Sequence, residues 1–307
     1  MTAESPRRGS ELAASLRKAG FKGSLTPDAP LAPFTSWRIG GPAELLAQPA
    51  GRDDVVTAQR WATTEQLSFR VLGNGSNLLV RDQGVAGLVL RMRRALESYR
   101  VEEQRVIGEG GASFPAMARS AALAGLRGLE FAAGIPGTLG GALVMNAGWH
   151  EYEIGKLVEW VDHLDEHGSL RRFDRDAAEF TYRDSLFRRE GGVILEASLW
   201  LERDESAEIE ARMERFAVSR KANQPTELPS CGSVFLKPPA DFAGRLIEEA
   251  GLKGLRIGGI EVSSKHANFF VKAGEATAAD ALALVERVEH EVERKFGVRL
   301  VREFELW

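Results

Sequence analysis

The sequence predicts an α+β fold, and three observations support that prediction. Helical segments and short strands alternate irregularly along the 307 residues, unlike the steady strand–helix repeat of a doubly wound sheet. Two well-marked helices fall in the last third of the chain. Two apolar, glycine-rich loops fit neither a regular helix nor a flexible linker. The length favours about two domains, although three small ones would also fit.

The first third of the chain predicts a compact α+β unit that ends near Arg94. We expect a frayed tail or short helix over residues 1–20 and a linker from Pro27 to Pro33. A helix capped by Asp53 or Asp54 should run to about Glu65. The strands expected after that helix cover residues 69–72, 78–80 and 87–92.

The middle of the chain predicts short strands and one clear helix. Ser113 should cap this helix, Pro115 lies in its first turn, and Gly125 ends it. The other elements expected here are strands over 158–164 and 193–201, a turn at 166–169, and a helix that carries Ile209, Met213 and Phe216.

The last third predicts two helices. The first covers 241–250, with Phe242, Leu246 and Ala250 on its apolar side and Gly251 as its stop. The second opens with a capping-box pattern from Thr277 to Asp280. Its apolar positions, which precede Gly297, are Leu282, Val285, Val288, Val292 and Phe296.

Composition excludes several classes of function. The net charge of −4 does not favour nucleic-acid binding, and we expect the cluster Arg91–Arg94 to be a solvated face. The single cysteine, Cys231, permits no internal disulfide and fits a reducing compartment. We expect no signal peptide and no membrane insertion, and therefore a cytoplasmic protein. No metal site is expected, since His163 and His167 flank a strand and turn rather than share a helix face.

The first glycine-rich loop is Gly73-Asn74-Gly75-Ser76-Asn77, between two apolar strands. Its glycines and asparagines tolerate positive φ, so that successive amides can converge on an anion. A β-hairpin turn would have a similar sequence, and both interpretations stay open here. The loop is not a Rossmann fingerprint, because Leu78 begins a strand where that motif begins a helix.

The second loop, from Gly134 to Gly148, has five glycines in fifteen residues but is apolar. Such a backbone is expected to pack against a flat ligand whose polar atoms its amides satisfy. A tightly packed structural turn is the alternative.

Seven segments, taken in order along nearly the whole chain, resemble the UDP-N-acetylenolpyruvoylglucosamine reductase (MurB) family of flavoenzymes. They are TSWRIGGPAE (35–44), VLGNGSNLLV (71–80), GLEFAAGIPGTLGGALVMNAG (128–148), YRDSLF (182–187), CGSVFLKPP (231–239), SSKHANFFVKAGEATAAD (263–280) and LVREFEL (300–306). The resemblance implies a vanillyl-alcohol-oxidase (PCMH) type fold, in the shorter form of the family that lacks an extra substrate-capping loop.

That resemblance also implies a domain organisation and a reaction. Two FAD-binding α+β subdomains would cover 21–94, joined by the C-terminal strand 298–307, and 95–216. A substrate-binding domain would cover 217–297. The expected reaction is the reduction of UDP-N-acetylglucosamine enolpyruvate to UDP-N-acetylmuramate in peptidoglycan precursor synthesis. It would use non-covalent FAD, with NADPH as co-substrate, in a protein expected to be a monomer.

The resemblance assigns roles to individual residues. Ser233 matches the proton donor, Arg183 matches the arginine that steadies the developing negative charge, and Glu303 matches the C-terminal catalytic glutamate. Substrate-binding positions would be Tyr182, Lys237 and His266. Positions expected to hold FAD are Gly73, Asn74, Gly75, Ser76, Asn77, Ile135, Gly137, Thr138, Gly140, Gly141 and Asn146.

The sequence departs from the family pattern at two places. Leu236-Lys237 stands where the family usually has Lys-Asn, and Lys237 is our candidate for the substrate diphosphate. Trp149-His150 follows the second loop where Ala-Tyr-Gly is usual. The residues alone also allow a surface salt bridge from Arg183 to Asp184 or Glu179. Another FAD-dependent oxidoreductase of the same fold, acting on a sugar or sugar alcohol, is the alternative function.

Overall fold

The computed structural model describes residues 5–307, with side chains from residue 8 onward. Contacts divide the chain into two compact units. Unit 1 comprises the chain through Ala29 together with Glu44–Asn74 and Ala86–Val218, and unit 2 comprises Pro30–Ala43, Gly75–Val85 and Ser219–Trp307. The first glycine-rich loop therefore passes from unit 1 to unit 2 between Asn74 and Gly75. The division into 21–94, 95–216 and 217–297 stays a prediction.

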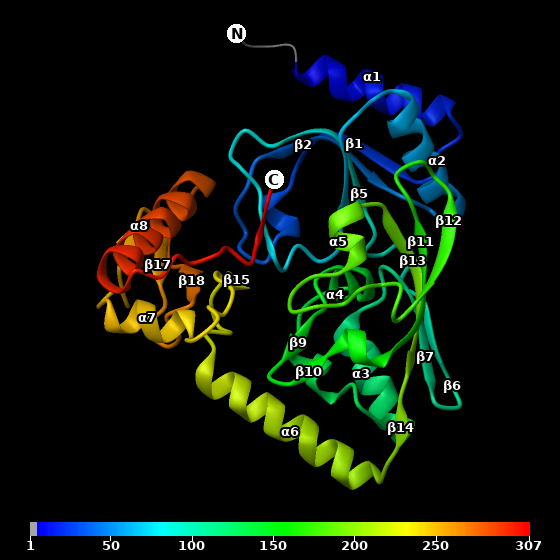
Figure 1. Ribbon diagram of the computed structural model, residues 1–307. Coiled ribbons are helices and arrows are strands. Elements are labelled where there is room, and N and C mark those ends of the chain that lie inside the picture. The colour runs from blue at the N-terminus through cyan, green and yellow to red at the C-terminus, as the bar shows by residue number, and fades with distance from the viewer. Residues whose placement is uncertain (1–4) are drawn as a thin grey trace. The chain divides into compact units, whose positions relative to one another are not determined.

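The first third of the chain forms a four-stranded sheet in the order β1-β2-β5-β3, with two helices (Figure 1). Its elements are α1 (Ser5–Lys18), β1 (Ser24–Pro30), η1 (Ala32–Phe34), β2 (Pro42–Gln48), α2 (Arg52–Thr64), β3 (Phe69–Leu72), β4 (Leu78–Leu79) and β5 (Val85–Arg91). The linker expected at 27–33 is wrong. Prolines are tolerated in β1 because it lies at an edge of the sheet.

Helix α2 lies where the sequence predicts it, but its expected cap is wrong. Gly51 is the N-cap, and no side chain caps the helix. The buried carboxylate of Asp54 instead accepts hydrogen bonds from the amides of Lys22, Gly23 and Ala50, at 2.7–2.8 Å. Asp54 therefore joins the loop before β1 to the residue that precedes the Gly51 cap.

The middle of the chain forms a five-stranded antiparallel sheet in the order β12-β11-β13-β7-β6 (Figure 1). Its elements are β6 (Tyr99–Glu102), β7 (Arg105–Glu109), α3 (Phe114–Leu123), β8 (Leu126–Arg127), η2 (Glu130–Gly134), α4 (Leu139–Val144), β9 (Gly148–Trp149), β10 (Tyr152–Glu153), η3 (Ile154–Leu157), β11 (Val158–Leu164), β12 (Leu170–Asp174), α5 (Leu186–Glu190), β13 (Val193–Trp200), β14 (Glu202–Arg203) and α6 (Ser206–Asn223). The helix and strands predicted here are confirmed, and Ser113 is the N-cap of α3 without a side-chain hydrogen bond.

The second glycine-rich segment is more regular than its composition indicates. It forms a short helix, α4, that contains Gly140 and Gly141. A Cβ atom at Gly140 would lie 3.0 Å from the carbonyl oxygen of Gly110, to which the Gly140 amide donates a 2.9 Å hydrogen bond. The glycine thus serves close backbone packing, which outweighs its low helix propensity.

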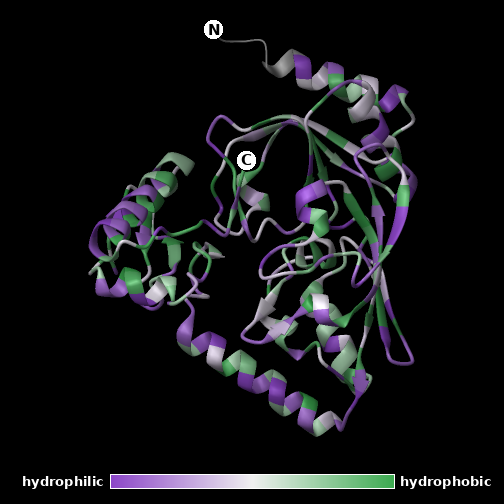
Figure 2. Cartoon of the chain, in the orientation of Figure 1, coloured by the Kyte–Doolittle hydropathy of each residue, from purple (hydrophilic) through white to green (hydrophobic). Residues whose placement is uncertain are grey.

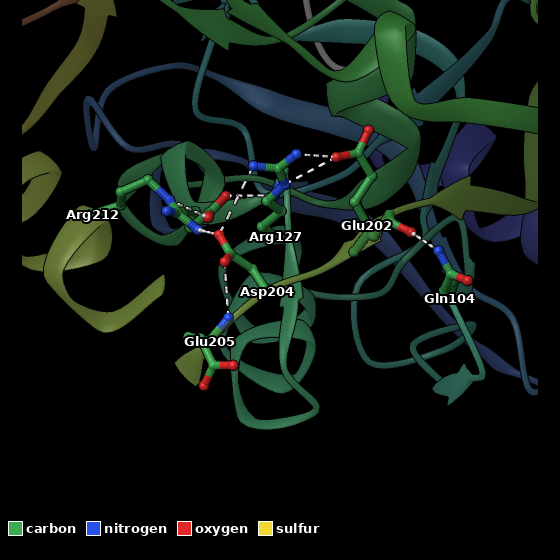
Figure 3. A network of polar contacts seen from close by, with 9 residues as sticks. Gln104, Arg127, Glu202, Asp204, Glu205 and Arg212 are labelled. Atoms are coloured by element: carbon green, nitrogen blue, oxygen red, sulfur yellow. Dashed lines mark hydrogen bonds and ion pairs between the residues drawn. The ribbon is translucent and has the colours of Figure 1, made fainter. Parts of the chain in front are cut away.

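An ion-pair network fixes the beginning of α6 within unit 1 (Figure 3). The Arg212 guanidinium donates to Glu130 at 2.8 Å and to Asp204 at 2.7 Å, and Arg127 pairs with Glu202 on the adjacent strand. Arg212, as the strongest cause, lowers the pKa of Asp204. The network joins α6 to β8 and β14.

Unit 2 contains the last third of the chain. Its elements there are β15 (Ser230–Ser233), α7 (Ala243–Glu249), β16 (Arg256–Ile257), β17 (Ile260–Val262), β18 (Phe269–Lys272), α8 (Ala278–Phe296) and β19 (Glu305–Leu306). The strands β15-β18-β17-β16 form one sheet, and β19 pairs in parallel with β4.

The two helices predicted in this unit are confirmed. Thr277 and Asp280 form the capping box of α8, and apolar and polar residues alternate along this helix (Figure 2). The expected burial of Phe242 is wrong, because Phe242 precedes α7 and its side chain is 62% exposed.

Three hydrophobic clusters form the core. Two lie in unit 1. One includes Trp61 of α2 and Leu88 of β5, and the other includes Phe114 of α3 and Phe131 of η2. The third lies wholly in unit 2 and includes Trp37. Among the described residues, no helix has the length and apolar character needed to cross a membrane.

Candidate functional site

The first glycine-rich loop is not a hairpin turn. It connects β3, which pairs with β5, to β4, which pairs with β19 in another sheet. Within unit 1, a Cβ atom on Gly73 would lie 2.6 Å from the Thr138 hydroxyl oxygen. The start of this loop therefore lies directly against the second glycine-rich loop, with no room for a side chain between them.

Arg93 supports the first loop, a role that no pattern in the sequence predicted. Its guanidinium donates a 2.6 Å hydrogen bond to the Asn74 side-chain oxygen. The reason is topological: β3 and β5 pair in parallel, from Phe69↔Leu88 to Leu72↔Arg91, so that the residues after both strands meet at one edge. The solvated face expected at Arg91–Arg94 is wrong in part, since Met92 between these arginines is buried.

Backbone hydrogen bonds fix the second loop to its neighbours. The Gly137 carbonyl accepts from the Phe114 amide at 3.1 Å, and the Leu139 amide donates to Ala112 at 2.9 Å. Thr138 is buried, and its hydroxyl accepts from the Gly141 amide at 3.3 Å. The predicted positions Ile135, Gly137, Thr138, Gly140 and Gly141 thus lie on one short, rigid stretch of unit 1.

The two loops fit a flavin dinucleotide where they meet on unit 1. A Cβ atom at Gly73 would lie 2.6 Å from the Thr138 hydroxyl oxygen, so only glycine fits at this point. Peptide groups at such a surface can bond the oxygens of a diphosphate. The residues present therefore suit FAD.

Arg183 lies in unit 1, in a turn closed by the bridge between Thr181 and Asp184. Its guanidinium donates to the carbonyl oxygens of Gly148, at 3.0 Å, and Asn146, at 3.5 Å. Asp184 and Glu179, the two carboxylates considered for a surface salt bridge, both pair with Arg189. Tyr182, predicted to bind substrate, is 51% exposed beside Arg183.

Asn146, near the end of the second loop, bonds to this turn. Its side chain donates to the Thr181 carbonyl at 2.8 Å and accepts from the Gly155 amide at 2.9 Å. Its contact to Glu153 is longer, at 3.3 Å. Asn146 is 1% exposed.

Unit 2 brings together Asn77, Ser233 and Glu303. Ser233 ends β15 opposite Phe269 of β18, and the Glu303 amide donates to the carbonyl of Val234 at 2.8 Å. The Asn77 side chain donates to the Glu303 carbonyl at 3.1 Å. The end of the first loop, the proposed proton donor and the C-terminal glutamate thus form one cluster on this unit.

A second hydrogen-bonded group lies beside Ser233. The buried Asn268 accepts from the Phe235 amide at 3.0 Å and donates to the Phe235 carbonyl at 2.8 Å. The backbone N–H of Asn268 donates to Nδ1 of His266 at 3.3 Å. Burial lowers the pKa of His266. Lys237 lies over the exposed ring of Phe242, 4.5 Å from its centroid.

Cys231 does not behave as a nucleophile. It is 2% exposed, within the core of unit 2. Burial, with the charge of Glu303 as the second cause, strongly raises the pKa of its thiol. A buried, protonated thiol is inert, so Cys231 packs rather than reacts.

Trp149 and His150, where the sequence departs from the family pattern, form an aromatic group in unit 1. Their rings stack with centroids 5.6 Å apart, and Trp149 also contacts Phe216 of α6. His150 and Phe216 line a hollow of about 230 Å³ together with Arg212 and Arg215.

These features define a flavin-binding α+β protein, and comparison with known proteins agrees. Residues 43–174 match the model of an FAD binding domain. Residues 224–307 match the C-terminal domain of UDP-N-acetylenolpyruvoylglucosamine reductase. The fold class predicted from the sequence is thereby confirmed.

The chain is similar over nearly its whole length to named relatives. It is 43% identical to UDP-N-acetylenolpyruvoylglucosamine reductase of Heliobacterium modesticaldum over 92% of this chain and 90% of that protein. It is 44% identical to the Moorella thermoacetica enzyme of the same name over 94% and 95%. The crystal structure of the Thermus caldophilus reductase (MurB) superposes with a TM-score of 0.81 at 36% identity, covering 94% and 99%. The chain belongs to the UDP-N-acetylenolpyruvoylglucosamine reductase family.

Proposed function

We propose that this protein reduces UDP-N-acetylglucosamine enolpyruvate to UDP-N-acetylmuramate, with tightly but non-covalently bound FAD and with NADPH as electron source. The observation that carries the proposal is the similarity to reductases of this name over more than nine-tenths of the chain. The product is a precursor of peptidoglycan. A nucleotide sugar and NADPH as reactants fit a cytoplasmic location.

The glycine-rich segments supply the residues that would hold the cofactor. We assign the diphosphate to the segments 73–77 and 135–141, because their glycines allow the backbone to approach a ligand closely. FAD, when bound, accepts a hydride from NADPH and delivers one to the terminal alkene carbon of the substrate. The chain itself must then manage negative charge and one proton.

Arg183 is assigned to the negative charge. Hydride addition to the alkene leaves carbanion character on the carbon next to the substrate carboxylate, and a permanent cation stabilises the resulting enolate-like charge. The guanidinium is already fixed by two carbonyl oxygens in unit 1, at 3.0 and 3.5 Å. A preorganised cation needs little rearrangement when the charge develops.

Ser233 is assigned to the proton. Its hydroxyl gives a proton to the carbon next to the carboxylate, which completes the addition of hydride and proton across the double bond. Glu303 assists from the neighbouring segment, whose amide bonds to the residue after Ser233. Lys237, Tyr182 and His266 are assigned to substrate binding, with Lys237 at the diphosphate.

The proposal is tested with the purified holoprotein. Acid precipitation should release all of its flavin into the supernatant, and flavin retained in the pellet would exclude a non-covalent cofactor. Adding the enolpyruvyl substrate should start NADPH consumption. UDP-N-acetylglucosamine, which lacks the enolpyruvyl group, is the matched control. A flavin-containing protein that oxidises NADPH equally with both compounds would contradict the proposed substrate.

A further inference from the structure

A buried amide connects the second glycine-rich loop to the turn that bears Arg183. The Asn146 side chain donates to the carbonyl of Thr181, two residues before Arg183, at 2.8 Å. Its oxygen accepts from the amide of Gly155 at 2.9 Å. Both ends of the amide therefore bond to backbone of unit 1, and the side chain is 1% exposed. Such a group orients the protein itself rather than a ligand.

Further hydrogen bonds join the same two segments. The hydroxyl of Ser185, which is fully buried, donates to the carbonyl of Val144 at 2.8 Å. The Arg183 guanidinium donates to Gly148 at 3.0 Å. Residues 144–148 and 181–185 are thus held together by side-chain-to-backbone bonds on both sides of Arg183.

The backbone of this turn needs support from its surroundings, and Arg188 supplies part of it by donating to the Arg183 carbonyl at 2.9 Å. Arg183 lies at φ +56°, in the left-handed region that a non-glycine residue adopts only when its surroundings fix it. Thr181 and Asp184 form an isolated bridge rather than part of a strand. The position of the guanidinium therefore depends on the bonds that Asn146 and its neighbours make.

We infer that Asn146 is a positioning residue for Arg183. Its amide holds the Arg183 turn against the second glycine-rich loop, so that the guanidinium is in place when the substrate carboxylate gains charge. The inference rests on the role proposed for Arg183 above. The assignment of Asn146 to FAD binding from the sequence stays a prediction.

The test separates the two half-reactions of the holoenzyme by stopped-flow absorbance of the flavin. In Asn146→Ala, reoxidation by the enolpyruvyl substrate should slow by roughly 10- to 100-fold, the effect of misplacing a group by about 1 Å. Flavin reduction by NADPH and retention of FAD should stay at wild-type levels, because neither step uses Arg183.

Asn146→Asp is the second variant and guards against misfolding of the first. Aspartate also tolerates the positive φ of 42° at this position and keeps the acceptor for Gly155. When ionised it cannot donate to Thr181, whereas the protonated carboxyl can. Reoxidation in this variant should therefore recover as the pH falls, relative to wild type in the same buffers. Melting temperatures measured at the same pH values must stay above the assay temperature, so that the recovery reports on the Arg183 turn and not on the folded fraction.

Gln59→Ala is the matched control for lost stability. Gln59 is a buried amide of unit 1 that donates to the Glu166 carbonyl at 3.0 Å, on elements that carry none of the proposed site residues. Its loss should lower the melting temperature and leave both half-reactions unchanged. If Asn146→Ala and Asn146→Asp behave in the same way, the positioning role is wrong.

A double variant tests whether Asn146 acts through Arg183. In an Arg183→Ala background, adding Asn146→Ala should cause no further slowing. A full additional loss in the double variant would contradict the inference while leaving the role of Arg183 intact. If Arg183→Ala alone does not slow reoxidation, the role proposed for Arg183 fails, and the positioning inference fails with it.

Discussion

Two buried asparagines, Asn146 in unit 1 and Asn268 in unit 2, each bond to a segment that carries a proposed catalytic residue. Asn146 bonds to Thr181, two residues before Arg183, and Asn268 bonds to both backbone groups of Phe235, two residues after Ser233. The two amides are 1% and 7% exposed. The backbone around them differs, and this difference predicts different consequences of their loss.

Ser233 is supported by strands, whereas Arg183 is not. Ser233 pairs with Phe269, and the neighbouring Val234 bonds through its amide to Asn268 and through its carbonyl to Glu303, both at 2.8 Å. Buried side chains at Cys231 and Phe235 secure the same strand in the core. Arg183 lies outside the strands, in a turn with an isolated bridge and with side-chain bonds from Asn146 and Arg188. Loss of Asn268 should therefore reduce stability, while loss of Asn146 should reduce the rate.

The largest effect is expected at Ser233. Ser233→Ala should leave flavin reduction by NADPH nearly intact and slow reoxidation by about 10²- to 10⁴-fold, the usual contribution of a positioned acid. Ser233→Cys should recover part of this loss, because a thiol is the stronger acid. Ser120→Ala, at a partly buried serine of α3 with no proposed role in the reaction, is the control. Equal loss in both half-reactions would mean that Ser233 shapes a shared site instead of donating the proton.

Replacing Arg183 should have the next largest effect. Arg183→Lys keeps the charge but loses the planar fork that bonds Gly148 and Asn146. Reoxidation should slow by about 10²- to 10³-fold, the range for losing a preorganised donor. Arg189→Lys, a neighbour in an exposed ion pair, should change neither half-reaction. A fully active Arg183→Lys enzyme would show that any cation suffices there.

Asn268→Ala sharpens the comparison with Asn146. It leaves both backbone groups of the buried Phe235 without their side-chain partner. The free energy of unfolding should fall by about 1–3 kcal/mol, measured by urea denaturation. Both half-reactions should keep nearly their wild-type rates, since strand pairing still holds Ser233. Selective slowing of reoxidation, as large as in Asn146→Ala, would remove the distinction between the two units.

The smallest effect concerns two histidines, the buried His163 in unit 1 and the partly buried His266 in unit 2. Burial lowers the pKa of both in the folded protein. Below about pH 6.5, the ordinary pKa of histidine, the unfolded chain therefore binds more protons than the folded protein. The contribution of the neutral histidines to stability is complete above that pH and is lost as the pH falls below it. Thermal unfolding across this range should show the decline, and His163→Phe should reduce it. An unchanged pH dependence in His163→Phe would contradict a neutral buried His163.

Local patterns were sufficient to predict much of the fold. The capping box and apolar spacing of α8 lie within one segment, so the sequence alone predicts where this helix starts and ends. The strands β11 and β13 were likewise predicted from their own residues. Elements fixed by distant partners were not: the prolines of β1 indicated a linker, and only its place at a sheet edge explains the strand.

The site shows the same limit. Family resemblance named Arg183, Ser233 and Glu303, but no pattern in the sequence indicated what positions them. Arg93 meets Asn74 only because β3 and β5 pair in parallel. The amide of Asn146 bonds to Thr181, 35 residues further along the chain. Such support depends on tertiary structure, which the spacing of residue types does not encode locally.

The most direct test of the proposed function follows the flavin of the wild-type holoenzyme through separate half-reactions without oxygen. NADPH alone should bleach the flavin absorbance, and the enolpyruvyl substrate added after removal of NADP should restore it and yield UDP-N-acetylmuramate. Each half-reaction should be at least as fast as steady-state turnover. A flavin that NADPH reduces only when the sugar nucleotide is also present, or that the sugar nucleotide does not reoxidise, would contradict the proposed reaction.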